Sequence, residues 1–154
     1  MNREIRKLRQ SFHYAICGVR ACMKTERNFR IHLTAAFYVA LAALMAGLDG
    51  VRCAVLCLCF GLMMGAELIN TAIERLCDRQ ATGFDCLVRE AKDIAAAAVF
   101  LCALFCVLIG VLFFLVEGAV WTVLAFLQVR LWAAGLLLVT IPAAVWFVFC
   151  YGQH

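Results

Sequence analysis

The sequence is poor in the features on which a water-soluble domain depends. Of its 154 residues one is proline and only 16% carry a charge, whereas 66% are hydrophobic. The mean hydropathy is +0.95. Soluble domains are about 45–50% apolar, so this chain has too little polar sequence to cover a packed soluble core. We therefore predict an all-α membrane protein for which the lipid bilayer is the main solvent.

Several familiar signals are also missing. The first thirty residues are charged and hold no apolar stretch ending in a small-residue cleavage site, so no cleavable signal peptide is expected. The sequence contains no P-loop, protein-kinase motif set, HExxH or nucleophile elbow, which argues against the soluble enzyme classes that these motifs define. The ten cysteines are scattered and mostly lie in apolar runs. We expect them to be small hydrophobic residues rather than disulfide partners or metal ligands.

Long apolar runs predict four membrane-spanning helices, each close to the roughly 17–25 residues that cross a bilayer. The predicted spans are Ile31–Leu48, Val51–Ala66, Ile94–Val116 and Leu131–Tyr151. The apolar stretch Ala119–Leu127 is too short to span, so we expect it in the interface or as an extension of the third helix. The predicted parts of the chain are an interfacial helix at 1–30, a core at 31–116 and a C-terminal segment at 117–154.

The basic residues gather on one side of this predicted bundle. Eight of the 14 precede Ile31, four lie within 75–92, and only Arg52 and Arg130 fall in the other loops. The positive-inside rule then places the N-terminus on the cytoplasmic side of the inner cell membrane. Apolar residues recur every three or four positions from Ile5 to Val19, which indicates either an amphipathic helix on anionic lipid or a simple positive anchor. We expect no nucleic-acid partner.

One predicted helix carries a stripe of polar residues inside an apolar run. Glu67, Asn70, Thr71, Glu74 and Asp78 share a helix face by their spacing, and an intramembrane charge costs at least about 2.5–3.5 kcal/mol, which favours a functional role. Glu67 and Glu74 are about 10.5 Å apart along the axis, too far to share one Mg²⁺ ion at about 2.0–2.1 Å. The spacing assigns Glu74, nearer the cytosol, to a metal and the deeper Glu67 to proton transfer.

Two further charged clusters, Glu26–Arg30 and Arg89–Asp93, precede the first and third predicted spans. Carboxylates that bind magnesium and cations that hold phosphates are the parts of a phosphoryl-transfer site. The same charges are also typical of ordinary helix ends and interfacial salt bridges. A non-catalytic membrane adaptor and a small ion transporter are therefore alternatives, although a transporter is expected to distribute its carboxylates through the bilayer.

Three motifs together closely resemble the prokaryotic diacylglycerol kinase/undecaprenol kinase family of small integral-membrane lipid kinases. They are ERNFRIH at 26–32, ELINTAIERLCD at 67–78 and AKDIAAAAV at 91–99, and the likeness covers about residues 5–116. The resemblance implies ATP- and Mg²⁺-dependent transfer of the γ-phosphate to a lipid hydroxyl by a homotrimer with composite sites. The family usually has three spans, so the predicted fourth span within 117–154 departs from it.

The resemblance also implies roles for individual residues. Glu67 matches the proton acceptor, Glu26 and Glu74 match metal-binding glutamates, and Asn70, Lys92 and Asp93 match polar residues around the phosphates. The implied ATP contacts are Lys7, Tyr14, Glu26, Glu74, Gly83, Phe84, Asp85, Lys92 and Asp93, and the implied lipid contacts are Glu67, Asn70 and Ala96. The FRIH and AKDIAAAAV forms look more like the undecaprenol kinase branch. Undecaprenol is thus the favoured acceptor and diacylglycerol the alternative, and we expect His32 to be structural.

Overall fold

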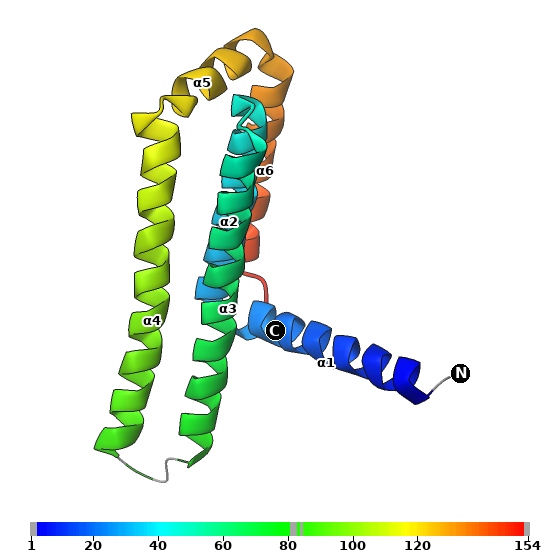
Figure 1. Cartoon of the computed structure of the whole chain (residues 1–154), viewed down its shortest axis with the longest axis vertical. Helices are drawn as coiled ribbons and strands as arrows, with labels where there is room; N and C mark the ends of the chain where they lie inside the picture. Colours follow the sequence, from blue (N-terminus) through cyan, green and yellow to red (C-terminus); the bar gives the residue numbers. More distant parts are fainter. Residues whose placement is uncertain (1–2, 81–82, 84, 153–154) are drawn as a thin grey trace.

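A computed structural model describes residues 3–80, 83 and 85–152, which form helices joined by short turns (Figure 1). The elements are α1 (Arg3–Thr25), α2 (Arg27–Ala46), α3 (Gly50–Gln80), α4 (Cys86–Val111), the π-helix η1 (Leu112–Val116), α5 (Ala119–Val129) and α6 (Leu131–Phe149). The described residues contain no strand, so the all-α prediction is confirmed.

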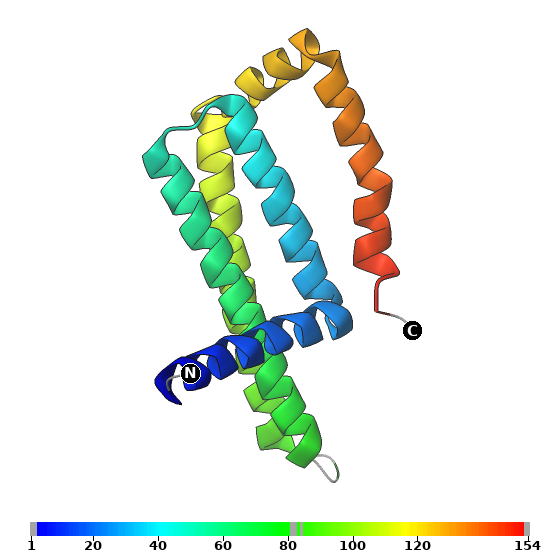
Figure 2. The same ribbon diagram turned by 90° about the vertical axis from the view of Figure 1, so that its right-hand side faces the viewer.

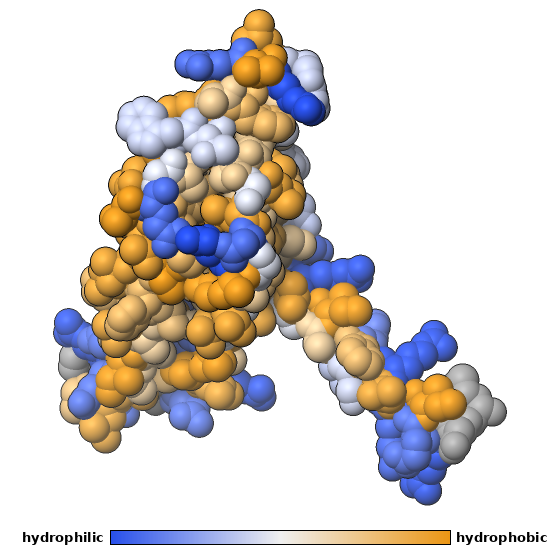
Figure 3. All heavy atoms as spheres, turned by 45° about the horizontal axis from the view of Figure 1, so that its top comes forward, coloured by the Kyte–Doolittle hydropathy of each residue, from blue (hydrophilic) through white to orange (hydrophobic). Residues whose placement is uncertain are grey.

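Four of the helices are long and apolar enough to cross a membrane: α2, α3, α4 continued by η1, and α6. Each of the four predicted spans thus corresponds to a helix of sufficient length and apolar composition. Large apolar side chains such as Phe105 and Trp132 are exposed on the outer surfaces of these helices. Apolar residues dominate the surface of the bundle in Figure 3. Exposure on this scale is unfavourable in water and ordinary in lipid, which identifies a membrane protein.

Helix α1 projects away from the bundle (Figures 1 and 2). Every residue from Arg3 to Arg20 is exposed, as expected for a helix with an apolar face toward lipid. The helix ends before Glu26, whose extended backbone (φ −101°, ψ 112°) separates it from α2. Helix α2 thus begins four residues before the predicted start at Ile31, because the helix continues backwards through the buried residues Phe29 and Arg30.

Polar residues and glycine end the helices at the tip of the bundle remote from the α3–α4 loop. Gly47 adopts a left-handed conformation (φ 65°) that closes α2. The Asp49 side chain accepts hydrogen bonds from the backbone amides of Val51 and Arg52 at 2.9 and 3.0 Å. These bonds, the Arg52 amide foremost, hold the pKa of Asp49 below its usual value. Arg52 also pairs with Asp49 and, at 2.6 Å, with Glu117.

Antiparallel helices α3 and α4 lie side by side, and their connected ends extend past α1 (Figures 1 and 2). After η1, Gly118 (φ 79°) begins a turn into α5, which packs across α2 as a separate helix. Helix α6 then returns along α2, so the C-terminal end of α6 lies near the α1–α2 junction (Figure 2). This arrangement brings α1, the start of α2 and the polar part of α3 to the same end of the bundle.

Candidate active site

The polar face of α3 is buried at Glu67 and exposed at Asp78, toward the α3–α4 loop. Glu67 and Thr71 are buried, Asn70 and Glu74 are half-buried, and Asp78 is exposed. The helical period places all five side chains on one face. The face therefore runs from the apolar interior toward the water-facing end of the hairpin.

Glu67 is the most deeply buried carboxyl group on this face, with 2% of its surface exposed. The Nε2 atom of His32, on α2, lies 3.3 Å from Glu67 Oε1, a contact that is an ion pair only when His32 carries a proton. The contact does not have hydrogen-bond geometry, and Glu67 Oε1 has no hydrogen-bond partner among the described residues. A buried acceptor left unsatisfied costs about 1–3 kcal/mol. Glu67 thus presents an oxygen that is ready to accept a proton or a hydrogen bond.

Asn70 provides a second unsatisfied oxygen on the same face. Its Nδ2 donates to Glu74 Oε1 at 2.9 Å. Its Oδ1 is buried and has no hydrogen-bond partner in the part of the chain that the structure describes. Side chains three residues apart are neighbours on a helix surface, so Glu67 and Asn70 offer two acceptors close to one place.

The end of α1 is fastened to α3 beside these acceptors. Cys22 Sγ lies 3.3 Å from Thr71 Oγ1 in a buried contact. Burial raises the pKa of the Cys22 thiol, so the group remains neutral near pH 7. All ten cysteines are free thiols in the structure. The Cys22–Thr71 contact places the α1–α2 junction next to the polar face.

Arg75 on α3 connects this helix to Glu26 at the α1–α2 junction. Arg75 donates from Nη2 to Thr25 Oγ1 at 2.6 Å, and the same nitrogen is 3.8 Å from Glu26 Oε1. Thr25 Oγ1 donates in turn to Glu26 Oε1 at 2.7 Å. The sequence analysis did not identify Thr25 or Arg75, since no pattern links two residues that are fifty positions apart. Arg75 does follow Glu74 directly in the α3 motif.

The carboxylate oxygens of Glu26 and Glu74 are suitable ligands for a magnesium ion that binds together with a phosphate-bearing substrate. Among the described residues, no group of three or more His, Cys, Asp or Glu side chains is arranged to hold a metal. Magnesium, however, is usually held by one or two carboxylates together with substrate phosphates and water, and not by an all-protein cage. Glu26 and Glu74 therefore fit this kind of binding by the chemistry of their carboxylate oxygens.

Lys92 and Asp93 are neighbours in sequence but differ in their contacts. Lys92 Nζ donates to Asp78 Oδ1 at 2.7 Å and so brings a cation from α4 to the α3 stripe. Asp93 is exposed and lies 3.8 Å from Arg89 on its own helix. Adjacent helical residues point about 100° apart, so the same α4 surface cannot direct both side chains at α3. Within one chain Lys92 joins the polar face and Asp93 does not.

The two residues of α1 that the resemblance implies as nucleotide contacts, Lys7 and Tyr14, have their polar partners on α1 itself. Lys7 pairs with Glu4 at 3.0 Å, and the Tyr14 hydroxyl accepts a hydrogen bond from Gln10 at 2.7 Å. Both interactions lie within the exposed α1 helix. Ala96, implied as a lipid contact, is exposed on α4.

The structure describes two of the three residues that the resemblance implies as ATP contacts in the α3–α4 loop. Gly83 is exposed in the loop. Asp85 is the N-cap of α4, and its side chain accepts hydrogen bonds from the amides of Leu87 and Val88 at 2.9 and 3.4 Å. Phe84 lies outside the described residues. Asp85 thus has a structural contact that the sequence analysis did not assign to it.

The helical membrane fold and the carboxylate-rich face indicate an integral-membrane protein with a polar site. The similarity of the chain to known proteins identifies its family. The model of the family described as prokaryotic diacylglycerol kinase matches residues 13–114. The chain is 42% identical over 101 residues to a diacylglycerol kinase of Synechocystis sp., covering 65% of this chain and 58% of that protein. It is 36% identical over 112 residues to an undecaprenol kinase of Bacillus subtilis, covering 73% and 91%. A diacylglycerol kinase of Helicobacter pylori is 33% identical over 105 residues, covering 68% and 81%.

These findings identify a small membrane protein of the lipid-kinase class. The chain belongs to the prokaryotic diacylglycerol kinase family, which confirms the resemblance found in its sequence motifs. It spans 58% of the length of the Synechocystis relative. Residues after 114 lie beyond the family match.

Proposed function

We propose that this chain transfers the γ-phosphate of ATP to the hydroxyl of a membrane lipid alcohol, in a reaction that depends on Mg²⁺. The buried, unpartnered oxygen of Glu67 is the observation that carries this proposal. It lies on a face that leads from the apolar interior to the polar end of α3. A lipid hydroxyl can approach such a group from the bilayer, and ATP can approach the same face from water.

In the proposed reaction Glu67 is the general base. The lipid hydroxyl donates to Glu67 Oε1 and transfers its proton as its oxygen bonds to the γ-phosphorus. The bond from that phosphorus to the oxygen bridging the β-phosphate breaks, and ADP leaves. General-base catalysis of this kind contributes about 10²–10⁴ to the rate. Glu67 Oε1 suits the role because it is buried and has no other hydrogen-bond partner among the described residues.

The other residues of the face bind and orient the phosphates. Glu26 and Glu74 hold Mg²⁺, which when bound neutralises part of the charge of the ATP phosphates. Lys92 stabilises charge that develops on the transferred group, and its 2.7 Å contact with Asp78 keeps it at the α3 face until the nucleotide binds. Asn70 contacts the lipid headgroup beside Glu67, and the 2.9 Å hydrogen bond from its Nδ2 to Glu74 fixes its orientation.

His32 orients the Glu67 carboxylate in this scheme. His32→Ala is expected to lower kcat by about tenfold, or about 1.4 kcal/mol in the barrier, because the carboxylate loses the neighbour that lies 3.3 Å from Oε1 and limits its movement. His32→Gln keeps an N–H donor near the position of Nε2, so we expect it to recover much of the loss. Initial rates at saturating ATP and lipid measure both effects. Wild-type kcat in His32→Ala would assign the 3.3 Å contact to packing alone.

We also propose that the working unit is a homotrimer, oriented with the α3–α4 loop and the N-terminus on the cytoplasmic side. Lys7, Tyr14 and Asp93 are exposed, and in the described part of the chain their side chains form polar contacts within their own helices. Sites completed by a neighbouring copy would give these side chains access to the nucleotide. The mass of the detergent-solubilised protein, corrected for bound detergent, tests the trimer.

The favoured acceptor is undecaprenol, with diacylglycerol as the alternative. The relatives include proteins named for each lipid, and the FRIH and AKDIAAAAV sequences favour the polyprenol. The test is transfer of label from [γ-³²P]ATP to undecaprenol or diacylglycerol, offered side by side at equal mole fractions to the purified protein. We expect a higher kcat/KM with undecaprenol. A higher kcat/KM with diacylglycerol would identify diacylglycerol as the preferred acceptor. If neither lipid is labelled, the kinase function is contradicted and a non-catalytic adaptor is favoured.

A further inference from the structure

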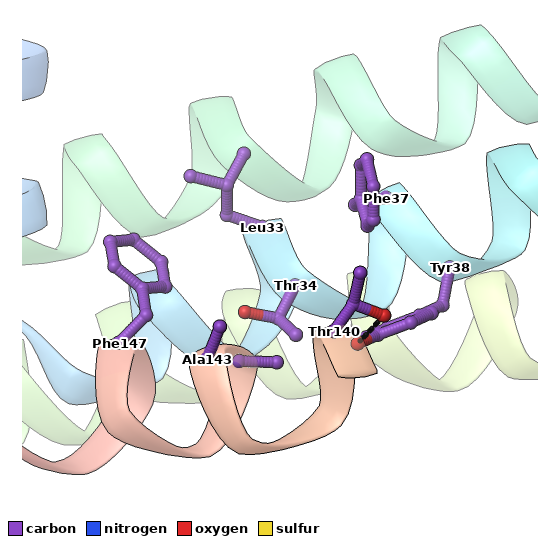
Figure 4. Close-up of a pocket in the computed structure, with 8 residues that line it drawn as sticks. Leu33, Thr34, Phe37, Tyr38, Thr140, Ala143 and Phe147 are labelled. Carbon is purple, nitrogen blue, oxygen red and sulfur yellow. Dashed lines mark hydrogen bonds between the residues drawn. The ribbon is translucent and has the colours of Figure 1, made fainter. Parts of the chain in front are cut away.

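Helix α6 and the residues after it contact the start of α2, although they lie beyond the family match at 13–114. Midway along the two helices the Tyr38 hydroxyl donates to Thr140 Oγ1 at 3.1 Å. Figure 4 shows this pair and the apolar side chains of α2 and α6, including Phe37 and Phe147, that line the shallow pocket between the helices. The contact continues to the C-terminal end of α6.

Arg30 joins three helices at that end. Its side chain is buried, with 4% exposure of the residue. Its Nε donates to the Val148 carbonyl at 3.0 Å, and Nη1 donates to the Met23 and Lys24 carbonyls at 3.0 and 3.1 Å. Carbonyls in the last turn of a helix lack intrahelical partners and carry the negative end of the helix dipole. The guanidinium thus binds the C-terminal ends of α1 and α6 together at the start of α2.

Gly152 makes a second contact at the same place. It has a positive φ of 84°, and a Cβ added there would collide with the carbonyl oxygen of Lys24. The backbone after α6 therefore passes directly against the end of α1, where only glycine fits. Tyr151 and Gly152 form one side of a polar cavity of about 640 Å³ whose other side includes Glu26 and Arg27.

We propose that the segment Val148–Gly152 is a positioning element for Glu26. It fixes the α1–α2 junction through Arg30 and Lys24, and it forms one wall of the open cavity that Glu26 also lines. Glu26 is then held at the position from which it binds the metal and phosphates of Mg·ATP. The kinetic part of this inference rests on the proposed function, whereas the docking of the segment does not.

The kinetic test compares Gly152→Ala with Gly135→Ala in the full-length protein. A Cβ at Gly135 in α6 meets open space, so this variant is the matched control. Gly152→Ala is expected to raise the KM for Mg·ATP by about fivefold or more and to leave kcat and the lipid KM within about twofold, the pattern of lost ground-state binding. A fall in kcat without a change in the KM for Mg·ATP would overturn the proposal.

Limited trypsin digestion tests the docking without any activity. Fragments ending at Lys24 and Arg27 are quantified by mass spectrometry for the wild type, both glycine variants and a chain that ends at Cys150. We expect these two cleavages to be about fivefold faster in Gly152→Ala and in the shortened chain, because the junction opens more often. Equal cleavage rates in Gly152→Ala and wild type would overturn the proposal. An inactive wild type with accelerated cleavage in the variants would contradict the kinase function and retain the docking.

Discussion

Glu67→Gln is expected to lower kcat for lipid phosphorylation by about 10²–10⁴-fold, because the amide cannot accept the proton of the lipid hydroxyl. The side chain is nearly isosteric and remains in the same buried position, 2% exposed in the wild type. The Kd for Mg·ATP should change by less than about threefold, since Glu67 acts on the lipid and not on the nucleotide. Single-turnover transfer from labelled ATP and equilibrium binding of a fluorescent ATP analogue measure the two effects separately.

Two control variants make this result specific. Glu67→Asp keeps a carboxylate that is one methylene shorter, so its kcat should lie between those of the wild type and Glu67→Gln. Glu90→Gln removes a charge from an exposed position on α4 at the same end of the bundle and should have nearly wild-type kinetics. Wild-type kcat in Glu67→Gln would remove Glu67 from the reaction and leave its burial as a structural feature only.

Glu26→Gln and Glu74→Gln are each expected to raise the Mg²⁺ concentration for half-maximal activity by about tenfold or more. The amide oxygen remains a ligand but lacks the negative charge that favours a hard cation, and each 1.4 kcal/mol of lost binding free energy changes the affinity about tenfold. Titration of activity with Mg²⁺ at fixed ATP measures the change. Circular dichroism of each variant checks that the helices are intact.

The double variant tests whether both residues bind the same ion. Ligands of one ion are coupled, so the combined effect should differ from the product of the two single effects by more than the error of the measurement. Independent effects that multiply would indicate separate roles for Glu26 and Glu74. An unchanged magnesium requirement in both single variants would exclude these carboxylates as metal ligands.

Apolar length and helical period predicted most of the architecture. The four spans follow from runs of hydrophobic residues, because only helices satisfy their backbone in lipid. The face formed by Glu67, Asn70, Thr71 and Glu74 follows from spacing alone, and in the structure Glu67 is buried and Glu74 half-buried, which agrees with their predicted order of depth. The roles assigned to these residues remain predictions.

Contacts with backbone atoms were beyond sequence reasoning. The position of the α1–α2 break depends on the burial of Arg30 against three carbonyl groups. Every residue carries a backbone carbonyl. The identities of Met23 and Val148 therefore do not predict that their carbonyl oxygens accept hydrogen bonds from a guanidinium. The sequence left Ala119–Leu127 either in the interface or as an extension of the third helix, and the structure instead has a separate helix α5 that packs across α2.

Local charge motifs predicted where cations and carboxylates gather but not which of them meet. Lys92 reaches Asp78 across the α3–α4 hairpin, whereas Asp93 remains with Arg89. The motif groups these residues because they are adjacent in the chain. The helix separates them because its period turns each one in a different direction.

The proposed reaction requires the phosphate donor and the lipid hydroxyl to meet at the polar face of α3. The most direct measurement is an experimental structure of the protein with Mg²⁺ and a non-hydrolysable ATP analogue in lipid. We predict the metal between Glu26 and Glu74, and the γ-phosphate positioned so that an oxygen bound at Glu67 lies about 3–3.5 Å from its phosphorus. A nucleotide bound away from this face, for example beside Asp49 and Arg52 at the opposite end of the bundle, would contradict the account.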